Sequence, residues 1–396
     1  MIPVIYIYFT IFVTSISCIS LFYLDFYPGE LSPFTIDVSG VEIFYWYIIN
    51  VLALLLVIFV YKYLSGFRFV FGYKIRVKHK ETNYLMLALL LINLVFVLET
   101  GVGVVGSNAT SPLTPLILLL KPDTFFYAYF LIMRPSFCRY KAVVFINVVL
   151  FSALKLSQGW SGFIFVLFFL EIYYRYQGRS SFKYMHYIFI APFIILFLGG
   201  ALYSKVYVIK NEIRNNPVEE ISMYEGVAHL ANRLSYLPIT IGSVQHHDSI
   251  VELYKVDSHI MKEFKSVFRP LLPSLIFKDK DFRTLNNVVM QSYYPNLSKG
   301  TSSNFGLPSY LYLLYSISPI EAFLYVFVSI FFVFLVKLFF DFISYFPGQL
   351  DFLVLLAMFN LVSIGSLEVV FSYGFFSNLT FLGIAILFGT FKVYKR

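Results

Sequence analysis

The sequence predicts an all-α polytopic membrane protein with about ten transmembrane helices, and three observations carry this prediction. The chain has 396 residues, of which 59% are hydrophobic and 13% are charged, whereas a soluble domain has about 25% charged residues. The hydrophobic residues form long runs of the length that a membrane-spanning helix needs, about 20 residues. Most of the connectors between these runs alternate between basic segments and segments without Lys or Arg. This composition excludes a soluble enzyme and a nucleic-acid-binding module.

Ten apolar runs are candidate transmembrane helices. The eighth is long, and we expect Ser316–Pro319 to break it into a short re-entrant piece and a helix, because proline cannot continue a helix. No Lys or Arg precedes the first run, so we expect a retained helix rather than a cleaved signal. The runs are 2–24, 42–64, 84–100, 111–133, 142–157, 160–175, 184–207, 308–337, 351–370 and 378–392.

The positions of Lys and Arg predict the orientation of the chain. Basic connectors stay in the cytoplasm, so we expect both termini to be cytoplasmic. The net charge of +8 is then mainly a topology signal and implies no polyanionic partner such as nucleic acid. The basic segments are 65–83, 134–141, 176–183 and the C-terminus, and the connectors without Lys or Arg are 25–41, 101–110 and 371–377.

One connector is much longer than the others and divides the chain into three parts. Residues 1–207 hold helices one to seven, residues 208–307 form a large loop with short amphipathic helices, and residues 308–396 hold helices eight to ten. The alternation of the basic connectors places this loop on the outer side of the membrane, since long loops are translocated despite positive charge. A loop of this length is usually functional or a small domain.

The first part of the loop is expected to be a helix with a polar stripe. Ser222 and Glu225 have the spacing of a capping box, and Glu225, His229 and Arg233 then follow at intervals of four residues on one face. One interpretation is an ordinary solvated face with a salt pair. The other is a stripe that faces an anionic, sugar-bearing substrate at the membrane surface.

A second group of cations follows in the loop. Arg269 lies in Phe268-Arg-Pro-Leu-Leu-Pro273, where the prolines exclude a helix, and Lys278 and Lys280 come soon after. Cations fixed beside a membrane suit phosphate or diphosphate, which Arg binds through two hydrogen bonds. A contact with lipid headgroups explains the same residues equally well. Lys155, near the outer end of the fifth run, either extends to the interface or meets the phosphate of a lipid carrier.

The remaining polar features of the loop allow several interpretations. His246-His247-Asp248 lacks the further ligands and spacing of a metal site, so no metal is expected, although either histidine is a candidate proton acceptor. The end of the loop, with Ser303 and Asn304, is rich in hydroxyl, amide and glycine residues. Such a segment suits carbohydrate binding, or is simply a turn-rich linker.

In its layout, the whole chain resembles the Wzy-type O-antigen polymerases of Gram-negative bacteria. The likeness is sharper in three segments: Ser157–Ile164, which opens a span after a Ser- and Gly-rich turn; Phe268–Pro273 with Lys278; and Thr301–Tyr310, before the chain re-enters the membrane. The chain departs from the family pattern at Gln158–Trp160, where an Arg is common, and in having Phe-Arg-Pro in place of Pro-Arg.

The resemblance implies a fold like that of the C-type glycosyltransferases and an active site at the periplasmic face of the bacterial inner membrane. Such enzymes join oligosaccharide repeat units carried on undecaprenyl diphosphate, which serve as donor and acceptor. We expect no metal or other cofactor, because no acidic pair has the spacing of a metal-binding motif. Membrane lipids are further partners, and a polysaccharide chain-length regulator is a candidate partner.

The chemistry of this reaction assigns roles to the residues. A sugar hydroxyl attacks an anomeric carbon and lipid diphosphate leaves, so positioned cations stabilise the charge that builds up on the leaving oxygens. We expect Arg233 and Arg269 to be catalytic, and we expect the proton acceptor to be His229, with His246 and Glu225 as alternatives. The weaker candidates for binding diphosphate or glycan are Arg214, Lys278, Lys280, Lys155, Ser303 and Asn304.

Three other functions fit parts of the sequence. An O-antigen ligase shares the layout but transfers glycan to lipid A core. A lipid-linked oligosaccharide flippase or another transporter is expected to have more spans and shorter outer loops, or repeated halves with broken helices. A non-enzymatic assembly factor needs no clustered arginines.

Overall fold

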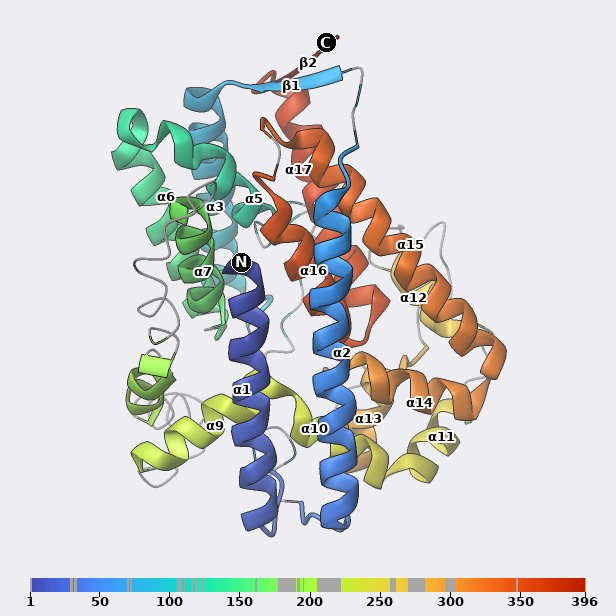
Figure 1. The fold of residues 1–396 in the computed structure, drawn as a ribbon. Coiled ribbons are helices and arrows are strands. Elements are labelled where there is room, and N and C mark those ends of the chain that lie inside the picture. Colours follow the sequence, from blue (N-terminus) through green and yellow to red (C-terminus); the bar gives the residue numbers. More distant parts are fainter. Residues whose placement is uncertain are drawn as a thin grey trace.

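The computed structural model is an α-helical protein with a single small sheet in its described residues (Figure 1). Outside the helices and this sheet, one isolated bridge joins Phe26 and Thr35. The structure describes residues 2–395 apart from 29–30, 32–33, 70, 72, 105–108, 110, 115–116, 118–119, 121, 123, 161, 177–189, 191–192, 195, 205–221, 257–260, 270–281, 296–302 and 347.

Among the described residues, six helical segments are long and apolar enough to cross a membrane. They confirm the all-α fold and indicate a multi-pass membrane protein. Their apolar residues run all round the helix, as is typical of helices surrounded by lipid or by other helices. The segments are α1 (Ile2–Tyr23), α2 (Gly40–Gly66), α3 (His79–Thr100), α6 (Phe137–Ser157), α15 (Pro319–Ile343) and the continuous run of η4 (Glu368–Phe375) and α17 (Phe376–Leu387).

Three of the other predicted runs contain shorter helices, and the run predicted at 184–207 lies only partly within the described residues. The shorter helices are α5 (Thr124–Met133), α7 (Phe163–Tyr176) and α16 (Asp351–Ile364). The run predicted at 351–370 ends early as a helix because Gly365 has φ +81°, a left-handed conformation that commonly ends helices. The number of spans, about ten, stays a prediction.

The predicted break in the eighth run is confirmed. α14 (Leu307–Ile317) ends one residue before Ser318, and α15 begins at Pro319. Proline has no N–H to continue α14 but fits the first turn of α15. The Ser318 hydroxyl accepts a hydrogen bond from the backbone N–H of Glu321, 3.4 Å away, and so caps α15.

The predicted capping box is also confirmed, at the start of α9 (Met223–Ser235). The backbone N–H of Ser222 donates to Glu225 Oε2 at 2.6 Å, and the N–H of Glu225 donates to Ser222 Oγ at 3.2 Å. α9 packs against α1. The described part of the segment 208–307 also contains the short helices α10 (Leu237–Gln245), α11 (His247–Val256), α12 (Lys262–Phe268) and α13 (Leu285–Tyr293).

The sheet joins two basic segments that lie far apart in the sequence. Strand β1 (Tyr73–Val77) pairs antiparallel with β2 (Phe391–Lys395), with Tyr73 opposite Lys395. The connector 65–83 and the C-terminus, both predicted to be cytoplasmic, therefore meet at one end of the molecule, which we call the ribbon end. The short 3₁₀ helix η2 (Arg134–Ser136) joins α5 to α6.

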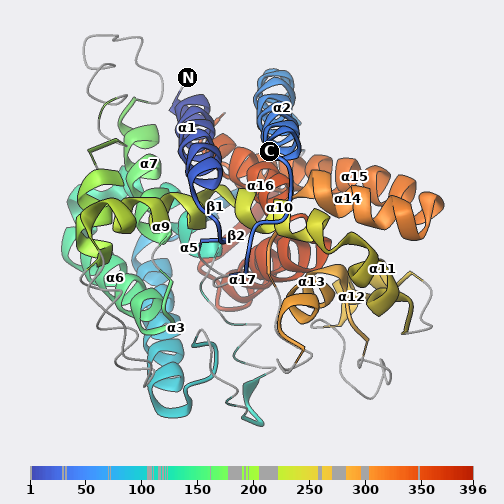
Figure 2. The same ribbon diagram turned by 90° about the horizontal axis from the view of Figure 1, so that it is seen from below.

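In Figure 1, α9, α10, α11 and α13 lie toward the end opposite the ribbon, and α12 lies nearer the middle of the molecule. α9 lies on the same side of the molecule as α6 and α7, whereas α11 and α12 lie on the other side, near α14 and α15 (Figures 1 and 2). α12 also packs against η4. This packing brings the end of α12 to the start of the last apolar segment.

Candidate functional site

Arg269 forms an ion pair with Glu368, and this pair is the centre of the candidate site. Arg269 follows α12, and Glu368 is the first residue of η4. Arg269 Nε donates to Glu368 Oε1 at 3.0 Å, and Nη2 donates to Oε1 and Oε2, both at 2.8 Å. The third guanidinium nitrogen, Nη1, donates to the carbonyl oxygen of Phe282 at 3.1 Å. The planar guanidinium therefore binds the carboxylate through three hydrogen bonds, of which Nε to Oε1 and Nη2 to Oε2 form the parallel pair typical of Arg and carboxylate.

The two partners differ in how far they are exposed. The Arg269 side chain is 24% exposed and the Glu368 side chain 9%. The guanidinium of Arg269 therefore lies between the Glu368 carboxylate and the protein surface. A buried pair is weak evidence for stability, because taking both charges out of water is costly. The pair lies at the start of an apolar helix, where charged groups commonly have a functional role.

Tyr325 fixes the turn that carries Glu368. Its hydroxyl donates to the Gly365 carbonyl at 2.6 Å and accepts from the Leu367 N–H at 2.7 Å. Gly365 also approaches the backbone of Gly306 so closely that a Cβ atom there would lie 3.0 Å from its carbonyl. The turn is thus held between α15 and the segment that precedes α14.

Two of the predicted glycan-binding residues belong to that segment. Ser303 is buried, and its N–H donates to the carbonyl of Asn286 at 3.1 Å. Asn304, next in sequence, is half-buried and is followed by Phe305, whose carbonyl accepts from Thr240 Oγ1 at 2.6 Å. The structure therefore places Ser303 and Asn304 near the turn before Glu368, in a packed segment rather than an open linker.

A second carboxyl group, Glu263, lies inside the same region. Its Oε2 accepts from the hydroxyl of Tyr310, and its Oε1 accepts from the N–H of Leu285 at 2.9 Å. Only 2% of the residue is exposed. Burial raises the pKa of Glu263 to about 7, more than the hydrogen bonds from Tyr310 and Leu285 lower it. Sequence reasoning missed Glu263, because its spacing to other residues gives no signal.

A buried amide adjoins this region as well. Asn286 is 2% exposed, and neither its side-chain oxygen nor its nitrogen has a hydrogen-bond partner among the described residues. An unpaired buried polar group is costly and rare in native structures. Asn286 is the second residue of α13, whose first residue, Leu285, is bound by Glu263.

The structure does not bring the predicted residues of α9 to Arg269. α9 carries His229 and the backbone of Arg233, and it lies across the molecule from α12 (Figures 1 and 2). His229 is half-buried, with its ring centroid 6.5 Å from that of Tyr203. The Arg233 side chain lies outside the described part of the chain, as do the residues Arg214, Lys278 and Lys280.

Lys155 faces the interior rather than the surroundings. It is 5% exposed, its Nζ donates to Gln158 Oε1 at 3.4 Å, and the same atom lies 5.3 Å from the centre of the Trp160 ring. Cations over aromatic rings are stabilised in this way. However, α6 lies on the opposite side of the molecule from α12 (Figures 1 and 2), so Lys155 is not part of the Arg269 site.

The two neighbouring histidines are engaged by other groups. His246 stacks on Tyr293 with ring centroids 3.9 Å apart, and burial lowers its pKa. His247 Nδ1 lies 2.8 Å from Asp248 Oδ1, and its Nε2 lies 3.0 Å from Ser316 Oγ. Among the described residues, no group of three or more His, Cys, Asp or Glu side chains is arranged to hold a metal ion.

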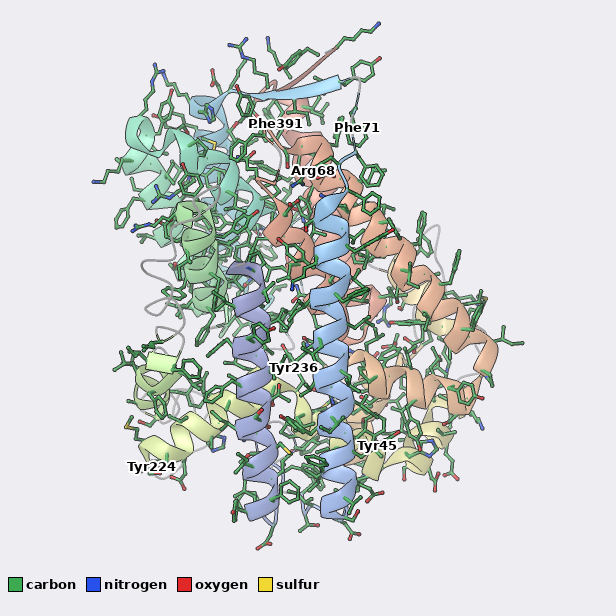
Figure 3. All side chains as sticks on the ribbon, viewed as in Figure 1. Tyr45, Arg68, Phe71, Tyr224, Tyr236 and Phe391 are labelled. Carbon is green, nitrogen blue, oxygen red and sulfur yellow. The ribbon has the colours of Figure 1, made fainter. Side chains whose placement is uncertain are left out.

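A second set of charged residues, at the ribbon end, was not predicted as a cluster. Lys337 Nζ lies 2.8 Å from Asp341 Oδ1 and 3.1 Å from Asp351 Oδ1, and Arg68 Nη1 lies 3.0 Å from the latter atom. Figure 3 labels Arg68 near the ribbon, whereas Tyr236 and Tyr224 lie toward the opposite end. The i, i+4 spacing of Lys337 and Asp341 within an apolar run was the available signal.

Comparison with known proteins gives no match. No protein-family model matches the sequence, and neither a curated protein nor a solved structure matches it significantly.

Proposed function

We propose that this protein is an O-antigen polymerase. It joins oligosaccharide repeat units linked to undecaprenyl diphosphate, by metal-independent glycosyl transfer at the periplasmic face of the bacterial inner membrane. The observation that carries the proposal is the position of Arg269. Its guanidinium is held, partly exposed, at the first residue of an apolar helix, which is where a lipid-borne diphosphate would lie.

The reaction needs positive charge at this point. A hydroxyl group of the acceptor unit attacks the anomeric carbon of the donor glycan, and the bond to the lipid diphosphate breaks. The electron pair of that bond stays on the diphosphate, which is a good leaving group only when its charge is stabilised. A preorganised guanidinium outside bulk water provides that stabilisation.

The membrane arrangement supports the same proposal. The ribbon end carries Lys392, Lys395 and Arg76 on paired strands, so the positive-inside rule assigns this end to the cytoplasm. The C-terminus is then cytoplasmic, the N-terminal end of α1 points toward the cytoplasmic side, and most of the described helices of the segment 208–307 lie toward the periplasm (Figure 1). Large apolar residues exposed on α2 and α15 give lipid tails a surface on which to lie.

The alternatives differ in the product that accumulates when the gene is lost. The nearest alternative is an O-antigen ligase, which has the same layout, and a flippase or transporter is the alternative from another class. A polymerase mutant leaves single repeat units attached to lipid A core. A ligase mutant leaves none, and a flippase mutant stalls units at the inner face.

The experiment is therefore a deletion of the gene in the bacterium that carries it, followed by gel analysis of surface polysaccharide. We expect the ladder of long chains to collapse to a single band of lipid A core plus one unit, and to return when the gene is restored. An unchanged ladder, or a complete loss of units from the core, would overturn the proposal.

A further inference from the structure

We infer that Glu368 is the proton acceptor of this reaction, and that Arg269 covers it until a diphosphate group draws the guanidinium away. The inference rests on the proposed function and adds to it a residue that touches the acceptor sugar. It differs from the expectation that His229, His246 or Glu225 takes this proton.

The contacts of Glu368 are what single it out. Within the described part of the chain, the carboxylate of Glu368 has hydrogen bonds from Arg269 and from no other residue. Neither Oε1 nor Oε2 accepts a hydrogen bond from a backbone N–H of the described residues, so nothing else described restrains the carboxylate once Arg269 moves. Arg269, by contrast, keeps a hydrogen bond to the carbonyl of Phe282.

Glu263, in the same region, is a carboxyl group that is enclosed on all sides and serves as a comparison for Glu368. Its two oxygens accept from a tyrosine hydroxyl and from a backbone N–H, contributed by α14 and α13. The departure of a single side chain cannot free it. Of these two carboxyl groups, only Glu368 is covered by a single, partly exposed side chain.

The other candidate acceptors lie elsewhere or are engaged. Glu225 caps its own helix across the molecule, and His229 lies on that same helix. His246 is stacked face to face on Tyr293. None of these side chains has a described contact with Arg269, so none would be exposed by its movement.

When Arg269 exchanges Glu368 for a diphosphate group, the carboxylate becomes available next to the leaving group. A diphosphate offers two anionic oxygens in the geometry that the carboxylate now occupies, so it competes with Glu368 for the same guanidinium face. Once the guanidinium turns to the diphosphate, it lies between the leaving group and the carboxylate of Glu368. A base must be within hydrogen-bond reach of the proton that it takes, and an acceptor hydroxyl that reaches this carboxylate would meet that condition.

The step balances as follows. The acceptor O–H bond breaks and its proton goes to an Oε atom of Glu368, while the oxygen forms a bond to the anomeric carbon. The bond between that carbon and the diphosphate oxygen breaks, and its electron pair stays on the diphosphate beside Arg269. Glu368 afterwards returns the proton to solvent or to the released diphosphate, and Arg269 covers it again.

Two measurements on the same variants separate this role from a structural one. The first is the affinity of the purified full-length protein, in detergent, for inorganic pyrophosphate, measured by titration calorimetry. The second is the surface-polysaccharide ladder in cells that carry only the variant. The variants are Glu368→Gln, Glu368→Asp and Arg269→Ala, with Glu171→Gln as a matched control. Glu171 pairs with Arg134 at 2.6 Å elsewhere in the fold.

We expect Glu368→Gln to bind pyrophosphate about tenfold more tightly than the wild type, because a neutral amide competes less well than a carboxylate for the guanidinium. The same variant should lose chain lengthening by about 100-fold or more, the contribution of a general base. Glu368→Asp keeps the carboxylate and should restore part of the lengthening. Arg269→Ala should lose both pyrophosphate binding and lengthening, and Glu171→Gln should change neither.

Only a general base that Arg269 covers predicts that Glu368→Gln binds pyrophosphate more tightly and also loses chain lengthening. Wild-type lengthening by Glu368→Gln would overturn the assignment of the base, and weaker pyrophosphate binding by the same variant would overturn the covering by Arg269. Equal loss in the Gln and Asp variants would indicate a structural ion pair and would also overturn it. Failure of the proposed function is recognised by a different experiment, because deletion of the gene would then leave the ladder unchanged or remove all repeat units from the core.

Discussion

Lys337 and Asp351 form a buried ion pair between neighbouring apolar helices, with Nζ 3.1 Å from Oδ1. Lys337 is 1% exposed, and Asp341 and Arg68 complete a set of two positive and two negative groups. Charges inside a membrane protein are costly unless they are paired. This balanced set holds α15 and α16 to the end of α2 on the ribbon side, away from the Arg269 site.

Removal of one charge from this set should destabilise the protein strongly. In Lys337→Ala, two buried carboxylates would share the half-exposed Arg68, and breaking such a pair costs about 3–5 kcal/mol. We expect a clear loss of thermal stability in detergent, measured by the unfolding midpoint. Lys395→Ala, at an exposed position of β2, is the matched control and should leave the midpoint unchanged. Equal midpoints for the two variants would contradict this account of the cluster.

The close approach of Gly365 to Gly306 predicts a second effect. A Cβ at Gly365 would contact backbone atoms at 3.0 Å, and φ is +81°, so Gly365→Ala should cost about 1–3 kcal/mol and displace the turn that carries Glu368. Gly383→Ala, in α17 with nothing within 4 Å of the added Cβ, should be neutral or slightly stabilising. Thermal unfolding of both variants checks this, and a harmless Gly365→Ala would show that the turn is not constrained.

The buried carboxyl of Glu263 predicts how stability depends on pH. Its pKa is raised from 4.5 to about 7 in the folded protein, so the folded state holds the proton more tightly than the unfolded state does. The Glu263 carboxyl therefore makes its full contribution to the free energy of unfolding below pH 4.5. This contribution falls as the pH rises toward 7, by about 3 kcal/mol in all. Glu263→Gln should flatten this slope, which unfolding midpoints at pH 5 and pH 8 would reveal. An unchanged slope would exclude Glu263 as its source.

Arg269 and Arg233 test whether the reaction uses one region of the protein or two. We expect Arg269→Ala to abolish long-chain polysaccharide, because it removes the cation at the start of η4. We predict the same loss for Arg233→Ala, although α9 lies across the molecule. The readout is the polysaccharide ladder, with immunoblots to confirm that each variant reaches the membrane. If Arg233→Ala retains the ladder while Arg269→Ala loses it, the active site is confined to the α12 side.

The sequence predicted local features of the fold well. The capping box at Ser222 and the break at Pro319 follow from hydrogen-bonding rules that act over three or four residues, and both are present in the structure. The apolar runs also predicted the long helices, because hydropathy alone decides whether a segment enters lipid. The end of α16 at Ile364 was not predicted, since the conformation of Gly365 depends on its contact with Gly306.

The candidate site was predicted only in part, because its residues lie far apart in the sequence. Arg269 was singled out by its prolines and neighbouring cations, but its partner Glu368 lies 99 residues later. No periodicity connects residues that far apart, and only the packing of α12 on η4 brings them together. Glu263 was missed for the same reason, because its burial depends on α13 and α14.

The most direct test of the account is a reaction with purified components. The protein is reconstituted in phospholipid vesicles and supplied with undecaprenyl-diphosphate-linked repeat units isolated from the deletion strain, without divalent metal. We predict lipid-linked chains of increasing length together with released undecaprenyl diphosphate, and neither product with Arg269→Ala. Repeat units that stay single in the presence of the folded wild-type protein would contradict the proposed activity.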